Sequence, residues 1–204
     1  MKKSILGIAT VTAVLAGCAS VPEQDIAAKA LAMMKASFKE RGQAKLERFD
    51  QDDAQKSCSL PPSVAIPKEV AERVEKANLA AVKYPADGKL LGNWREGEKI
   101  AQSGVGKQYS DDPKRPSGGN CYACHQLTKA EISYGTIGPS LYNFGKLRGY
   151  SDAMRRYAYG KIWNAQAYTA CSNMPRFGHN GILSEQQVRD VTALLMDPES
   201  PVNK

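Results

Sequence analysis

The five residues 121–125, with the sequence CYACH, constrain this chain more than any other feature. Two cysteines two residues apart, followed at once by a histidine, form the pattern of covalent haem attachment. The thiols of Cys121 and Cys124 add to the two vinyl groups of a haem, and His125 meets the iron from one side. Two intervening residues place the sulfurs at the right separation within one helical turn. The sequence therefore predicts one covalently bound haem c.

Two other interpretations of this cysteine pair fit the sequence less well. A redox-active dithiol does not need the histidine that follows. A zinc site needs a second pair of ligands. Once Cys18 is assigned to lipid, the only cysteines and histidine left to supply that pair are Cys58, Cys171 and His179. Export, indicated by the N-terminal segment, also favours haem, because c-type haem is attached outside the cytoplasm.

The N-terminal segment predicts export. Residues 1–3 are basic at Lys2 and Lys3, and an apolar stretch follows that is too short for a stable membrane span. Residues 15–18, LAGC, resemble a bacterial lipobox, in which Cys18 is lipidated and becomes the new N-terminus. Ordinary secretory cleavage nearby is the alternative. We therefore expect a signal peptide over residues 1–17 and a periplasmic protein, lipid-anchored through Cys18, in a compartment that permits disulfides.

Length and charge exclude some classes of partner. The chain of 204 residues is long enough for one domain with an extension. Without Lys2 and Lys3 the formal charge of +7 falls to +5, and no dense run of basic residues is present. A nucleic-acid partner is therefore not expected.

The hydrophobic pattern predicts an all-α protein. Apolar residues recur at helical spacing, and no segment shows the alternation of a β-strand. Ser151 and Ser184 are placed to cap two helices, the second through a capping box with Gln187. The glycine- and proline-rich residues 104–119 predict a long loop. The predicted helices cover residues 24–56 with a break, 67–84, 94–103, 151–163 and 184–198.

Once haem is accepted, the chain resembles a class I cytochrome c. Residues 135–141, GTIGPSL, stand where that family carries a loop whose proline carbonyl accepts the Nδ1 hydrogen of the iron-binding histidine. The resemblance implies that Pro139 orients His125 and makes its other nitrogen a better donor. It also implies the class I fold.

The second axial ligand is expected in residues 168–181, YTACSNMPRFGHNG. Met174 is favoured, because Pro175 follows it as is common in this family, and because a methionine ligand gives a low-spin iron of raised potential. His179 would give a bis-histidine haem, Cys171 a thiolate-bound haem, and an open position a catalytic or gas-binding haem. These alternatives stay open at the level of the sequence.

Cysteine counting predicts a disulfide. Of five cysteines, Cys18 is assigned to lipid and two to haem, so Cys58 and Cys171 are left to pair. The bridge would close a loop of over a hundred residues, worth roughly 4 kcal/mol in the chain-entropy model. It would hold the N-terminal extension beside Met174. Two unpaired buried thiols are the alternative, and an unlipidated Cys18 could compete as a partner.

Three longer segments together resemble the SoxX family, the monohaem subunit of the SoxAX cytochrome of thiosulfate oxidation. They are GGNCYACHQL, ISYGTIGPSLYNFGKLRGY and ACSNMPRFGHNGILSEQQVRDVTALLMDPESPVNK. The resemblance is strongest over residues 90–204, which we assign to a cytochrome c domain, with residues 18–89 as an N-terminal helical extension.

The resemblance implies a set of partners and a division of labour. A SoxA subunit forms a heterodimer with this chain, the complex joins thiosulfate to a cysteine of the SoxYZ carrier, and the chain passes electrons to a downstream cytochrome. His125 and Met174 would then be iron ligands and no residue a catalytic acid, base or nucleophile. A free-standing electron carrier is the main alternative, followed by a peroxidase or gas-binding haem protein.

Overall fold

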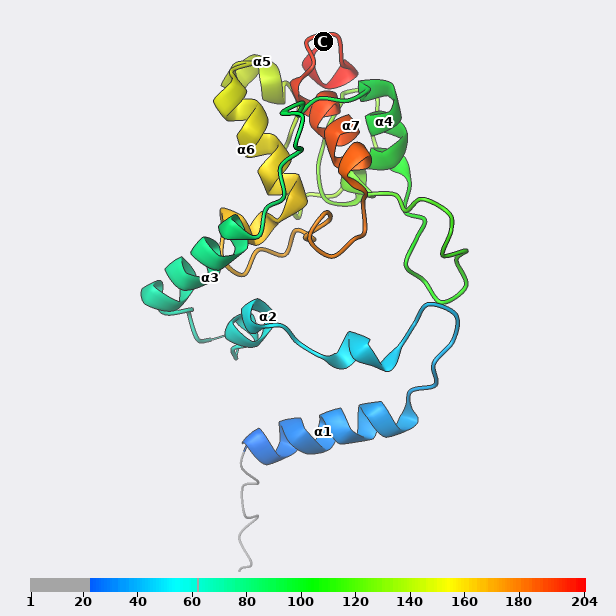
Figure 1. The fold of residues 1–204 in the computed structure, drawn as a ribbon, viewed down its shortest axis with the longest axis vertical. Helices are drawn as coiled ribbons and strands as arrows, with labels where there is room; N and C mark the ends of the chain where they lie inside the picture. The colour runs from blue at the N-terminus through cyan, green and yellow to red at the C-terminus, as the bar shows by residue number, and fades with distance from the viewer. Residues whose placement is uncertain (1–22, 62) are drawn as a thin grey trace, which may run out of the picture. The chain divides into compact units, whose positions relative to one another are not determined.

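The computed structural model describes residues 23–61 and 63–204 (Figure 1). The predicted signal peptide, residues 1–17, and the predicted lipidation site at Cys18 lie outside these residues. The described residues divide into two compact units, the first ending at Lys39 and the second beginning at Glu40. Among the described residues, no helix combines the length and the apolar character needed to cross a membrane.

The described residues are helical and contain no β-strand, apart from one isolated bridge between Arg41 and Ala44. The predicted all-α fold is therefore confirmed. The α-helices are α1 (Glu23–Ser37), α2 (Asp53–Cys58), α3 (Lys68–Ala80), α4 (Trp94–Gln102), α5 (Phe144–Arg148), α6 (Asp152–Trp163) and α7 (Glu185–Met196). Short 3-10 helices are η1 (Leu46–Phe49), η2 (Cys121–Ala123), η3 (Ala165–Ala167) and η4 (Pro201–Asn203).

The first predicted helix, residues 24–56, is three separate helices in the structure. Helix α1 ends at Ser37, the short η1 follows, and α2 begins at Asp53. Within the first unit, α1 exposes the apolar side chains of Ile26, Leu31, Met33 and Met34. The division between the units falls after Lys39, whereas the boundary at 89/90 follows the family resemblance and stays a prediction.

Helix α7 is the centre of the second unit. It packs against α4 and α6 (Figure 1), and all four of its predicted inward residues, Val188, Val191, Leu194 and Leu195, are buried. The α4–α7 contact is close enough to need a glycine: a Cβ on Gly97 would lie 2.2 Å from the carbonyl oxygen of Asp190. This close contact fixes α4 and the segment that follows it against α7.

The two predicted helix caps are present. The Ser151 hydroxyl accepts a hydrogen bond from the Met154 amide of α6, and Ser184 forms a reciprocal capping box with Gln187 of α7. These caps satisfy amides that would otherwise lack partners in the first turn. The five-residue helix α5, between the haem-motif region and α6, was not predicted.

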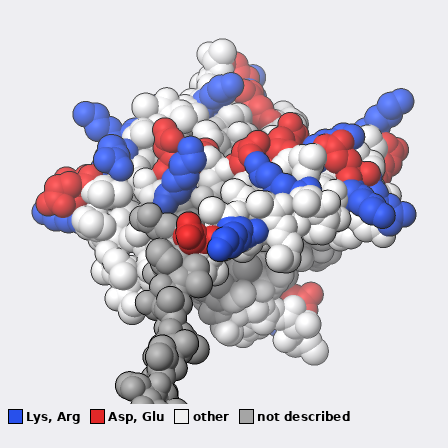
Figure 2. Space-filling model, turned by 90° about the horizontal axis from the view of Figure 1, so that it is seen from below, with Lys and Arg blue, Asp and Glu red and all other residues white. Residues whose placement is uncertain are grey.

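Charged side chains of both signs are interspersed on the face shown in Figure 2. Several basic residues pair with an acidic residue three or four positions away, as Lys99 does with Glu96 and Arg189 with Glu185. Such pairs neutralise charge locally. The described part of this face therefore presents mixed charge.

Candidate haem site

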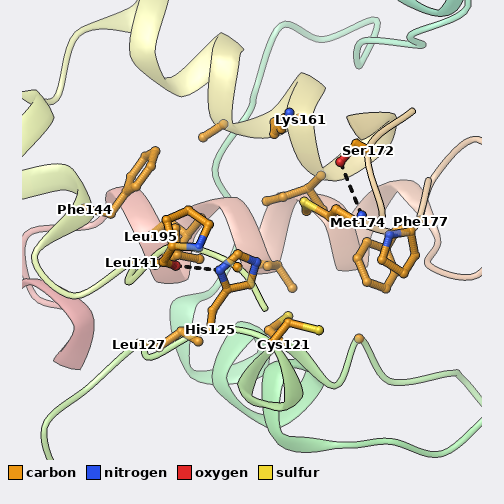
Figure 3. A pocket seen from close by; sticks show the side chains of 18 of the residues that line it. Cys121, His125, Leu127, Leu141, Phe144, Lys161, Ser172, Met174, Phe177 and Leu195 are labelled. Atoms are coloured by element: carbon orange, nitrogen blue, oxygen red, sulfur yellow. Dashed lines mark hydrogen bonds between the residues drawn. The ribbon is translucent and has the colours of Figure 1, made fainter. Parts of the chain in front are cut away.

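A cavity of about 610 Å³ opens between the CYACH segment, α5, α6, α7 and the loop that carries Met174 (Figure 3). Its volume falls within the range of cofactor and small-molecule sites, about 300–1,000 Å³. Its walls are largely apolar, and among the side chains that form them are Leu127, Leu141, Phe144, Ile162, Phe177 and Leu195. A flat, apolar, covalently tethered cofactor suits such walls.

The CYACH segment, which begins with the 3-10 turn η2, forms the lower edge of this cavity in Figure 3. The His125 amide donates to the Cys121 carbonyl oxygen at 2.9 Å, which closes the turn. Tyr122 is buried, and its hydroxyl donates to a carboxylate oxygen of Glu98 in α4 at 3.0 Å. With Tyr122 anchored to α4, the side chains of Cys121, Cys124 and His125 all line the cavity.

The imidazole of His125 is held in one orientation. Its Nδ1 lies 2.7 Å from the carbonyl oxygen of Pro139, as the family resemblance implies. A carbonyl only accepts, so Nδ1 carries the hydrogen and Nε2 keeps a free lone pair for a metal. The ring also lies against Gly138, where an added Cβ would stand 2.1 Å from His125 Cε1. The turn at 138–139 is thus shaped around this ring.

The thiol of Cys121 lies in the largely apolar wall of the cavity. Burial raises its pKa to about 12, and thiols buried in apolar surroundings are less reactive than exposed thiols of low pKa. Within residues 23–61 and 63–204 no group of three or more His, Cys, Asp or Glu side chains is placed to hold a metal ion. Nothing described therefore completes a zinc site.

The loop between α6 and α7 forms the opposite part of the cavity wall. Met174 lines the cavity, and its amide donates to the Ser172 hydroxyl at 3.2 Å (Figure 3). His179 is exposed and is not among the lining residues. Cys171 is joined to Cys58 by a disulfide, the pairing that sequence analysis expects. Of the three candidates for the second axial ligand, Met174 alone lines the cavity.

The N-terminal extension holds the Met174 loop at two further points. Arg176 is buried, and its Nη2 lies 2.5 Å from Oδ2 of Asp52, the N-cap residue of α2. The Ala170 amide donates to a carboxylate oxygen of Glu75 in α3 at 2.9 Å. Burial by itself would raise the pKa of Asp52, but the Gln55 amide and Arg176 outweigh it, and the pKa is lowered. The loop is therefore fixed to α2 and α3 by covalent and polar bonds.

Sequence reasoning missed two cations at the cavity, Arg148 of α5 and Lys161 of α6. Lys161 could have been found, because it shares a helix face with Tyr157, Ala158 and Ile162, which also line the cavity. These positions follow the i, i+1, i+4, i+5 spacing of one helical stripe. A lysine within an otherwise apolar stripe is the signal.

Comparison with known proteins agrees with this geometry. The cytochrome c family matches residues 96–197. A protein from Aquifex aeolicus (strain VF5), described as an uncharacterized lipoprotein, is 38% identical over 170 residues, which cover 79% of this chain and 80% of that protein. The family match implies covalently bound haem c and a role in electron transfer. The chain belongs to the cytochrome c family.

Proposed function

We propose that the cavity holds one haem c, tethered by Cys121 and Cys124, with His125 and Met174 as its axial ligands. One observation carries the proposal: His125 and Met174 reach the same cavity from different segments, and the bond to Pro139 leaves His125 Nε2 free to bind. When bound, the haem supplies a one-electron redox centre, and a His/Met ligand pair favours a raised potential. The chain itself orients the imidazole and positions the thioether.

The tethering residues are tested by haem staining after denaturing electrophoresis. Full-length protein should give a stained band, because thioether bonds survive denaturation. The double variant Cys121→Ser/Cys124→Ser should lose it. The matched control, Cys58→Ser/Cys171→Ser, removes the same number of sulfurs from the disulfide and should keep the stain. A stained band from Cys121→Ser/Cys124→Ser would refute the tethering proposal. A wild-type protein that gives no stained band would refute it as well.

We further propose that the chain acts as the electron-transfer subunit of a SoxAX-type complex. The family match supports the electron-transfer role, and the resemblance of the combined segments around CYACH, Pro139 and Met174 to SoxX supports the choice of complex. In such a complex, forming a sulfur–sulfur bond between thiosulfate and a SoxYZ cysteine releases two electrons and the thiol proton. The chain accepts electrons from the SoxA haem and passes them to a downstream cytochrome, and it binds no substrate at its own iron.

Two exposed isoleucines that follow the CYACH segment are our candidates for the contact with SoxA. Ile132 is 90% exposed and Ile137 is 77% exposed, and Ile137 also lines the cavity. Exposed apolar side chains near a redox centre suit a partner that must approach closely. Ile137→Asp should reduce co-purification with SoxA, whereas Leu79→Asp, at an exposed leucine of α3, should not. A wild-type chain that stays monomeric beside SoxA would instead support a free-standing carrier.

We propose that the mature protein is periplasmic and lipid-anchored through Cys18. The lipobox at residues 15–18 supports this, as does the similarity to the Aquifex aeolicus protein described as a lipoprotein. Mass spectrometry of the membrane fraction should find the N-terminal peptide starting at Cys18 with acyl chains. Cys18→Ser should abolish the acylated peptide. An unmodified Cys18 in the wild-type protein would refute the anchor and leave ordinary secretion.

A further inference from the structure

Lys161 occupies an unusual position in the last turn of α6. It lines the cavity beside apolar neighbours, and its ammonium donates to the carbonyl oxygen of Ala165 at 3.2 Å and to the hydroxyl oxygen of Thr169 at 2.9 Å. An ammonium group has three donors, so these two bonds leave one donor unused. Among the described residues, no acidic side chain forms a salt bridge with Lys161.

A cation in such a wall is costly unless something pairs with it. Burial lowers the pKa of Lys161, and the carboxylate of Glu75 opposes this only in part. Glu75 is already engaged with the Ala170 amide. The titratable and charged side chains lining the cavity are those of Cys121, Cys124, His125, Arg148, Tyr157 and Lys161. None of these six side chains is a carboxylate that could pair with Lys161. An anionic group of the bound ligand would supply the missing negative charge.

The position of Lys161 relative to Cys121 indicates which anionic group of the haem lies nearest to Lys161. The two residues lie at opposite edges of the pocket in Figure 3. In a haem, the two pyrrole rings that carry vinyl groups form one edge, and the two that carry propionates form the opposite edge. A haem tethered at Cys121 and Cys124 therefore directs its propionates away from the CYACH turn, toward the wall that carries Lys161.

We propose that Lys161 forms an ion pair with a propionate carboxylate of the bound haem, through the donor that Ala165 and Thr169 leave unused. This proposal rests on the proposed function, because it requires haem in the cavity. The pair keeps the propionate ionised and places a fixed positive charge near the iron. Lys161 thereby tunes the reduction potential and holds the haem edge without ligating the metal.

The test is the pH profile of the haem reduction potential, measured by spectroelectrochemical titration of the full-length haem protein. An opposite charge nearby lowers a carboxyl pKa by about 1–3 units. In Lys161→Met the propionate pKa should therefore rise by at least about one unit. Since ferric iron favours the ionised propionate, the potential should then fall as pH increases through that range. Lys161→Arg should restore the wild-type profile.

Two more variants sharpen the result. Lys146→Met removes an equal charge from an exposed position of α5 and should keep the wild-type profile. Lys161→Gln keeps a hydrogen-bond donor but no charge, and should behave like Lys161→Met. The ion pair is overturned if the reduction potential of Lys161→Met or Lys161→Gln depends on pH in the same way as that of Lys146→Met. That result leaves the proposed function intact. A wild-type chain without covalent haem overturns both.

Discussion

The disulfide between Cys58 and Cys171 gives the most quantitative prediction. It joins residues 113 positions apart. In the chain-entropy model, closing a loop of this size in the unfolded chain is worth about 4–5 kcal/mol. The double variant Cys58→Ser/Cys171→Ser should lose about this amount of unfolding free energy. With a denaturant slope of about 2 kcal/mol per molar urea, the midpoint of unfolding should fall by about 2 M.

The structure also predicts where the native state loosens. Cys171 lies three residues before Met174, and the loop keeps its bonds from Arg176 to Asp52 and from Ala170 to Glu75. The variant should therefore fold, with the loop opening more often than the helices. Hydrogen exchange should accelerate at amides of residues 169–176 and change little in α7, because local opening follows local contacts.

The assay pairs urea unfolding with hydrogen exchange on oxidised and reduced protein. Reductant should shift the wild-type midpoint to that of the double variant, and should leave the double variant unchanged. Two results would refute the reasoning. One is a loss of unfolding free energy below about 1 kcal/mol. The other is exchange that accelerates in α7 as much as in the Met174 loop.

Two further predictions concern the residues around the axial ligands. Gly138→Ala places a Cβ 2.1 Å from His125 Cε1, so it should displace the imidazole and lower the yield of haem-stained, low-spin protein. Asp52→Asn keeps a good N-cap residue but removes the ion pair to buried Arg176, and should cost about 1–2 kcal/mol in urea unfolding at pH 7. Because folding lowers the pKa of Asp52, its stabilisation is present above the unfolded pKa and is lost as pH falls through the folded value. The difference between wild type and Asp52→Asn should therefore shrink below about pH 4, and a constant difference down to pH 2 would contradict the assignment.

Features encoded over a few neighbouring residues could be predicted from the sequence. Ser151 and Ser184 act through amides within three residues, so their helices begin where expected. The CYACH turn is equally local, because Cys121 accepts from His125 within one turn. The pairing of Cys58 with Cys171 follows from elimination, because the other cysteines are assigned to lipid and haem.

Apart from that disulfide, the polar contacts that join distant parts of the chain could not be predicted. Asp52 and Arg176 are 124 positions apart, and nothing near either residue indicates the other. Helix α5 has only five residues, after an N-cap residue, Asn143, in the left-handed region with φ of 57°, so it is too short for a helical period to show. The unused donor of Lys161 is defined only once Ala165 and Thr169 have been placed.

The axial ligation of the haem is the central claim, and the near-infrared absorption of the ferric protein tests it most directly. Iron bound to a methionine sulfur gives a weak charge-transfer band that histidine, thiolate and water ligands do not reproduce. We predict that the wild-type protein and His179→Ala show this band, and that Met174→Ala loses it while keeping its covalent haem. A wild-type spectrum without the band, or a band that survives in Met174→Ala, would contradict the account.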